Sequence, residues 1–91
     1  MPDSFFELHI QVYSVNGPYF DTPIHCGPYI SYVEAASVMM DGLHIVLSCH
    51  MSAISNQLEN PTVYSKIVER ALLDDGRIED LGTKSEEVRS L

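Results

Sequence analysis

The stretch FFELHIQVYSV, at residues 5–15, alternates apolar and polar side chains with a period of two. Such alternation is typical of a β-strand with one face on the core and one face in water. The stretch runs into Asn16-Gly17, a pair favoured in two-residue hairpin turns because both central positions need positive φ. We therefore predict an N-terminal β-hairpin, with strands at about 5–15 and 19–25. The core side carries Phe6, Leu8, Ile10 and Val12, and the wet side carries Glu7, His9, Gln11 and Tyr13.

The second strand of this hairpin lies beside two prolines, Pro18 and Pro23. Proline has no N–H group to donate to a neighbouring strand. We therefore expect this strand at a sheet edge, or broken by an irregular bend.

A helix is predicted over residues 32–41. Ser31 and Glu34 have the spacing of a capping box, in which each side chain satisfies a backbone N–H at the start of a helix. Gly42 then occupies the position at which a glycine with positive φ commonly ends a helix.

Residues 43–59 fit two patterns. The segment 43–49 alternates and is rich in β-forming side chains, which favours a third strand followed by a short helix at about 52–59. Apolar residues also recur at helical spacing over the same segment, which favours one helix. The residues at helical spacing are Leu43, Leu47, Met51, Ile54 and Leu58.

The C-terminal part is predicted to hold a second long helix, at about 61–75. Asn60-Pro61 has the composition of a helix start, and Asp75-Gly76 that of a helix end. Together these elements predict an α+β fold, with a single compact domain over residues 1–82 and a short polar tail over 83–91.

The charge of the chain is strongly negative and unevenly distributed. The net charge is -8, and residues 1–65 contain six acidic residues and neither lysine nor arginine. Binding to nucleic acid needs several cations to neutralise phosphates, and anionic membranes repel acidic surfaces. We therefore expect no direct nucleic-acid binding and no membrane binding. An acidic field instead favours association with a protein that has a basic surface.

The sequence shows no catalytic or metal-binding pattern. Cysteine and histidine are adjacent at His25-Cys26 and Cys49-His50, but neighbours in a strand point to opposite faces and do not converge on one ion. A reactive thiolate needs a cationic setting, which this region lacks. We therefore expect neither an enzyme nor a metal or other cofactor. The absence of an export signal and the presence of only two cysteines favour a cytoplasmic protein with both thiols free.

Aromatic residues gather in and near the predicted hairpin, where tyrosine can pack against a partner while its hydroxyl stays in water. We expect a protein-binding surface formed by these aromatics and by scattered carboxylates. Whether the carboxylates share one face is the observation that tests this expectation. The expected contact residues are Tyr13, Tyr19, Phe20, Asp21, Glu34, Asp41 and Glu59.

No stretch of the sequence is specific enough to indicate a known family. The function that the composition favours is a small acidic binding module that inhibits a partner by covering its basic or nucleic-acid-binding surface. Anti-defence proteins such as anti-CRISPR proteins, antitoxins and immunity proteins act in this way. The alternative is a homo-oligomeric structural or assembly protein without catalytic activity, most simply a homodimer formed through the hairpin edge or an apolar helix face.

Overall fold

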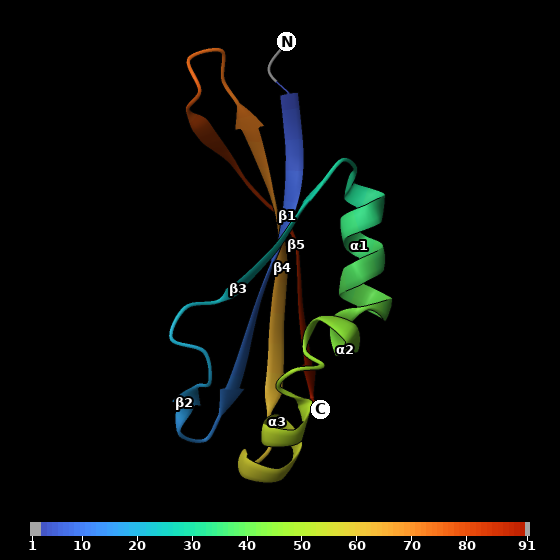
Figure 1. Ribbon diagram of the computed structural model, residues 1–91, viewed down its shortest axis with the longest axis vertical. Coiled ribbons are helices and arrows are strands. Elements are labelled where there is room, and N and C mark those ends of the chain that lie inside the picture. The colour runs from blue at the N-terminus through green and yellow to red at the C-terminus, as the bar shows by residue number, and fades with distance from the viewer. Residues whose placement is uncertain (1–2, 91) are drawn as a thin grey trace.

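A computed structural model describes residues 3–90 (Figure 1). Within these residues one antiparallel β-sheet dominates, and three short helices lie on one side of it. The strands are β1 (Asp3–Ser14), β2 (Gly17–Pro18), β3 (Ile24–Tyr29), β4 (Thr62–Leu72) and β5 (Ile78–Ser90). The helices are α1 (Tyr32–Asp41), α2 (Leu43–Val46) and α3 (Met51–Gln57).

Strand β1 is the centre of the sheet. It pairs with β2 and β3 along one edge and with β4 along the other, and β5 pairs with the far side of β4. The molecule is elongated, 47 × 24 × 20 Å, because the β4–β5 hairpin and the start of β1 extend beyond the helices (Figure 1). The helices therefore cover only part of one face.

The predicted α+β fold with C-terminal helices is wrong. The predicted helix at 61–75 is strand β4, and the predicted polar tail at 83–91 falls, as far as residue 90, within strand β5. Along β4, the side chains at 63, 65, 67, 69 and 71 share the face toward the helices, but Ser65 and Glu69 interrupt the apolar alternation. The remaining apolar residues happen to match helical spacing, which explains the error.

The pair Asp75-Gly76 closes a hairpin and does not end a helix. The N–H of Gly76 donates to the carbonyl of Leu73 at 2.9 Å, and Leu73 N–H donates to the carbonyl of Arg77 at 2.8 Å. Gly76 has φ of +86°, as expected for the glycine that follows a turn in a three-residue hairpin loop. Likewise Asn60 has φ of +50° and leads into β4, so it caps no helix.

The third strand predicted at 43–49 is also wrong. Residues 43–46 form α2 and residues 51–57 form α3, close to the short helix predicted at 52–59. The segment is therefore helical, as its spacing indicated, but it forms two helices and not the single helix of the alternative. A strand would have placed Ile45 and Cys49 beside Leu43 and Leu47, yet Ile45 and Cys49 are exposed. All the residues at helical spacing contribute to the core, namely Leu43, Leu47, Met51, Ile54 and Leu58.

The helix predicted at 32–41 is present as α1. Ser31 Oγ accepts the N–H of Glu34 at 3.2 Å, which is one half of the capping box. The Glu34 carboxylate accepts the N–H of Ile30 at 3.4 Å in place of that of Ser31. Gly42, however, has φ of -110° and leads directly into α2, so α1 does not end in the predicted positive-φ glycine.

The N-terminal hairpin differs from the prediction in its second strand. The turn is centred on Val15 and Asn16, one residue earlier than expected, and β2 is only two residues long. Residues 19–23 then bend away, and pairing with β1 resumes only at β3. The prediction of a strand at 19–25 is therefore wrong for most of its length, and the alternative of an irregular bend beside the prolines is correct.

The side chain of Gln11 replaces the missing strand pairing at this bend. Its Oε1 accepts the N–H groups of Phe20 at 3.1 Å and of Val12 at 3.0 Å, and its Nε2 donates to the carbonyl of Phe20 at 3.0 Å. Gln11 is buried, on the side of β1 that the alternation predicted to be wet. One side chain thus holds the bend against the sheet.

The core lies between the sheet and the helices. It is formed by one face of β1 and β4 and by the inner sides of α1, α2 and α3. Its fully or nearly buried residues are Leu8, Ile10, Val12, Ala35, Met39, Leu43, Leu47, Ile54, Val63 and Ile67. No helix within residues 3–90 is long and apolar enough to span a membrane.

Candidate functional site

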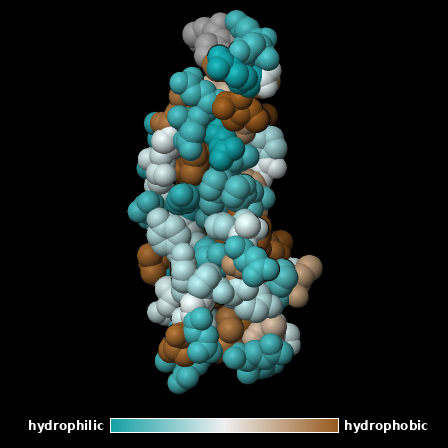
Figure 2. All heavy atoms as spheres, turned by 90° about the vertical axis from the view of Figure 1, so that its left-hand side faces the viewer, coloured by the Kyte–Doolittle hydropathy of each residue, from teal (hydrophilic) through white to brown (hydrophobic). Residues whose placement is uncertain are grey.

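The sheet face opposite the helices, which we call the open face, is mainly polar. Figure 2 shows this side of the molecule, with hydrophilic residues predominating and apolar patches scattered among them. Residues of the open face come from four strands, because alternate side chains of each strand point to the same side. They include Glu7, His9, Gln11, Tyr13, His25, Tyr64, Lys66, Arg70, Glu86 and Val88.

Two histidines and one glutamate meet on this face. Glu7 and His9 are two residues apart on β1 and so point the same way, and His25 of β3 lies directly opposite His9. The imidazole rings of His9 and His25 are stacked, with centroids 3.8 Å apart and planes 6° from parallel. His9 Nε2 lies 3.2 Å from Glu7 Oε1. One ligand atom from each of the three residues falls within 4.8 Å of the others.

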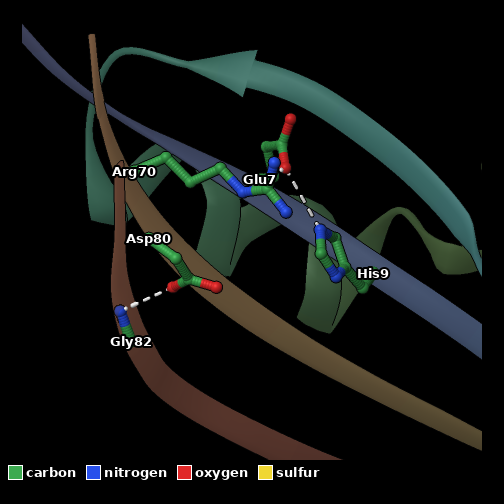
Figure 3. A network of polar contacts seen from close by, with 5 residues as sticks. All are labelled: Glu7, His9, Arg70, Asp80 and Gly82. Carbon is green, nitrogen blue, oxygen red and sulfur yellow. Dashed lines mark hydrogen bonds and ion pairs between the residues drawn. The ribbon is translucent and has the colours of Figure 1, made fainter. Parts of the chain in front are cut away.

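Arg70 of β4 reaches over Glu7 (Figure 3). Its Nε lies 3.1 Å from Glu7 Oε1, within ion-pair distance. The Nε–H is buried and makes no hydrogen bond to any described residue, so this contact is a charge pairing and not a well-directed hydrogen bond. Glu7 Oε1 is therefore shared between a guanidinium and an imidazole.

The imidazole of His9 favours its neutral form. Its pKa is lowered, chiefly because burial disfavours the charged ring. The hydrogen bond to Glu7 opposes this effect, whereas the neighbouring His25 and Arg70 add to it. At neutral pH His9 is thus an uncharged ring with one nitrogen lone pair.

A shallow cavity of about 150 Å³ adjoins the histidine stack. Its wall includes His9, Tyr13, Tyr64 and Lys66. The pKa of Tyr64 is raised, mainly by a hydrogen bond to Glu86 on β5. The cavity therefore combines aromatic walls with several hydrogen-bonding groups, a composition common in sites for small ligands.

The signal for this group was present in the sequence. Glu7 and His9 occupy alternate positions of a strand with strong alternation. Nevertheless, Glu7, His9 and His25 were not predicted to form a group. The pairing of His25 with His9 depends on where β3 resumes after the bend, which the sequence pattern did not predict.

The two cysteines lie apart from this group. Cys26 points to the core side of β3, where burial raises the pKa of its thiol, and Cys49 is exposed after α2. Both are free, so they form no disulfide.

Of the aromatic residues predicted to bind a partner, only Tyr13 is well exposed. Tyr19 and Phe20 are half-buried and pack against the core. Their rings contact each other edge-on at a centroid distance of 4.9 Å, and Phe20 contacts His50 at 5.0 Å. These two rings attach the bend to the helical layer, so removing either would first test stability.

The predicted carboxylates do not gather on one face. Asp21 lies in the segment between β2 and β3, on the opposite side of the molecule from α1, and Glu59 follows α3 (Figure 1). Glu34 and Asp41 both belong to α1, where seven residues amount to about two turns, so they lie along one side of that helix. All four side chains are exposed and form no ion pair within residues 3–90.

Apolar residues line the solvent side of the helical segment. Val33 and Met40, also seven residues apart on α1, are 74% and 60% exposed. Ile30, just before the helix, is 88% exposed, and Ile45 on α2 is 68% exposed. We call these four residues, with Glu34 and Asp41 beside them, the outer helix face. The exposure of these four apolar side chains was not predicted from the sequence, because apolar residues of these types are more often buried.

The cations are almost all neutralised within the molecule. Of the five lysines and arginines, only Lys66 forms no ion pair among the described residues. The ion pairs are Arg70–Glu7, Arg77–Asp75, Lys84–Glu69 and Arg89–Glu87. The charge left to act on a partner is therefore mainly negative.

Comparison with known proteins gives no functional information. No family model, no curated protein and no solved structure matches this chain.

Proposed function

We propose that this protein is a small acidic protein-binding module, acting in the cytoplasm, that blocks a basic, nucleic-acid-binding surface of a partner protein. The contact surface is the outer helix face. The observation that carries the proposal is the exposure of Ile30, Val33, Met40 and Ile45 beside two unpaired carboxylates, in a part of the chain that has neither lysine nor arginine.

Exposed apolar side chains in this number support a binding role. Water disfavours them by roughly 25 cal/mol for each Å² of apolar surface, so covering them with a partner is favourable. A well-packed apolar centre with a charged rim is typical of protein interfaces. Here Val33 and Met40 would form the centre, and Glu34 and Asp41 the rim.

The charge pattern supports a basic partner. Four of the five cations are already paired with carboxylates of this chain, so few remain to bind phosphate. Unpaired carboxylates at the rim of an interface mainly accelerate association with an oppositely charged surface. A partner that itself binds nucleic acid has such a surface.

Self-association is supported less well. Strand β5 is a sheet edge with two irregularities in its pairing with β4, and it carries Gly82 and Lys84 there. Strand β3, on the other side of the sheet, contains Pro28 and follows Pro23. Bulges, charges and prolines discourage edge-to-edge pairing. A two-fold dimer through the outer helix face would bring Glu34 and Asp41 of one copy near the same carboxylates of the other copy, and like charges repel.

The test starts with capture of partners from an extract of the source cells on immobilised protein. For a captured partner, association and dissociation rates are then measured at low and at physiological salt. We expect the association rate to fall steeply with salt while the dissociation rate changes little. We also expect this protein to displace the partner's nucleic acid.

Two pairs of variants locate the contact surface. Val33→Ser with Met40→Ser should weaken binding at least tenfold through faster dissociation, whereas Val15→Ser with Val88→Ser, which alters equally exposed residues elsewhere, should not. Glu34→Gln with Asp41→Asn should slow association, whereas Asp74→Asn with Glu79→Gln, of equal charge change, should have less effect. Unchanged binding in the first variant of each pair, or an association rate independent of salt, would contradict the proposal.

A further inference from the structure

We propose that Glu7, His9 and His25 bind a divalent transition-metal ion of the zinc class on the open face of the sheet. This site is separate from the outer helix face and does not depend on the proposed function. The three side chains come from two neighbouring strands, and their ligand atoms lie within 4.8 Å of one another.

The spacing of the first two ligands suits a tetrahedral ion. Two atoms that each lie 2.0–2.1 Å from a tetrahedral zinc ion are about 3.3 Å apart. His9 Nε2 and Glu7 Oε1 are 3.2 Å apart. An ion can therefore replace the proton that these two atoms share, with little movement of β1.

His25 has to turn to complete the site. A metal ion lies close to the plane of each imidazole that binds it, and the parallel stacked rings of His9 and His25 do not share such a point. His25 is exposed, so its ring can rotate without disturbing the core. The stack is thus the arrangement of the site without its ion.

The chemistry of the ligands determines the class of ion. Two imidazole nitrogens and one carboxylate oxygen favour zinc, copper or nickel, whereas calcium and magnesium prefer oxygen ligands only. Binding requires Glu7 Oε1 to exchange its contact with Arg70 for the ion. The second carboxylate oxygen remains available to the guanidinium, so Arg70 can stay beside Glu7.

Three protein ligands leave one tetrahedral position for an exchangeable ligand such as water. His9 belongs both to the ligand set and to the wall of the 150 Å³ cavity. The remaining position would therefore be accessible to a small molecule held between Tyr13, Tyr64 and Lys66.

The test is a calorimetric titration of the metal-free full chain with zinc chloride at pH 7.5. We expect saturation at one ion per chain. His25→Ala should weaken binding at least tenfold, and Glu7→Gln should also weaken it. His44→Ala, which removes another exposed histidine, and Cys49→Ser, which removes the exposed thiol, should leave the affinity unchanged.

Thermal unfolding without zinc provides the control for folding. Because His25 is exposed, His25→Ala should unfold at the temperature of the parent when metal is absent, and only the parent should gain stability on adding zinc. The absence of saturable binding, or binding as tight in His25→Ala as in the parent, would overturn the proposal. Loss of binding in Cys49→Ser or His44→Ala would overturn it too, because the ion would then lie elsewhere.

Discussion

Replacing Gln11 by methionine should destabilise the protein more than any other single polar substitution on the open face. Methionine keeps the length and most of the volume of the side chain but has no strong donor or acceptor. The change removes the hydrogen bonds of Gln11 with Phe20 N–H, Phe20 C=O and Val12 N–H. Because Gln11 is buried, water reaches these groups poorly once their partner is lost.

The expected loss follows from these three bonds. A hydrogen bond contributes about 1 kcal/mol net, and a buried group left without a partner costs about 1–3 kcal/mol. We therefore expect the free energy of unfolding to fall by about 2–4 kcal/mol. That is a large share of the total for a chain of this length, which is roughly 5–14 kcal/mol.

Equilibrium unfolding in guanidinium chloride measures this change. With a slope of about 4 kcal/mol per molar guanidinium chloride, typical of small proteins, the midpoint should fall by about 0.5–1 M. Gln57→Met, at the exposed end of α3, is the matched control and should change the midpoint little. A Gln11→Met midpoint equal to that of the control would refute the view that this side chain holds the bend at residues 19–23.

Three further predictions concern stability. Gly76→Val should lower the free energy of unfolding by about 1–2 kcal/mol, because Gly76 has φ of +86° and a β-branched residue is strained there, although the space around an added Cβ is open. Gly76→Asn should lower it less, and equal denaturation midpoints for the two variants would contradict this. Ser65→Ala should raise the free energy of unfolding by about 1 kcal/mol, because the buried Oγ has no hydrogen-bond partner among the described residues. The exposed control Ser55→Ala should not raise it. A loss of stability in Ser65→Ala would show that the hydroxyl does make a hydrogen bond. Stability should fall as pH drops through 6.5, because burial in the folded chain lowers the pKa of His9, with help from His25 and Arg70 and against the effect of Glu7, so the unfolded chain takes up the proton more readily. In His9→Asn, denaturation curves between pH 7.5 and 5 should show less of this loss.

The sequence by itself determined the elements whose signals are local. The alternation at residues 5–15 determined strand β1, because a period of two puts one set of side chains on the core. Ser31 and Glu34 determined the start of α1, since capping involves groups only three residues apart. The charge distribution also follows from the sequence alone, and with it the expectation that the chain does not bind nucleic acid directly.

Where apolar residues matched both a strand and a helix spacing, only the tertiary structure determined which element formed. At residues 61–75 the polar Ser65 and Glu69 lie on the core face of β4, so the alternation was broken and a helix was wrongly predicted. The pair Asp75-Gly76 serves equally well in a hairpin, and its role depended on whether β5 was present to pair with β4. That pairing joins residues from 62 to 90 and is not encoded in any short window.

The candidate sites were likewise determined partly by the sequence and partly by the tertiary structure. The sequence placed Glu7 and His9 on one side of a strand, but pairing across β1 and β3 brought His25 to them, since the bend at 19–23 sets the register. The carboxylates Asp21, Glu34, Asp41 and Glu59 are exposed, as acidic side chains usually are, yet the path of the chain between the strands and the helices separated Asp21 from α1. Side-chain character is a property of the sequence, whereas proximity between distant residues arises only when the hydrophobic face of the sheet is covered by helices and its strands are paired.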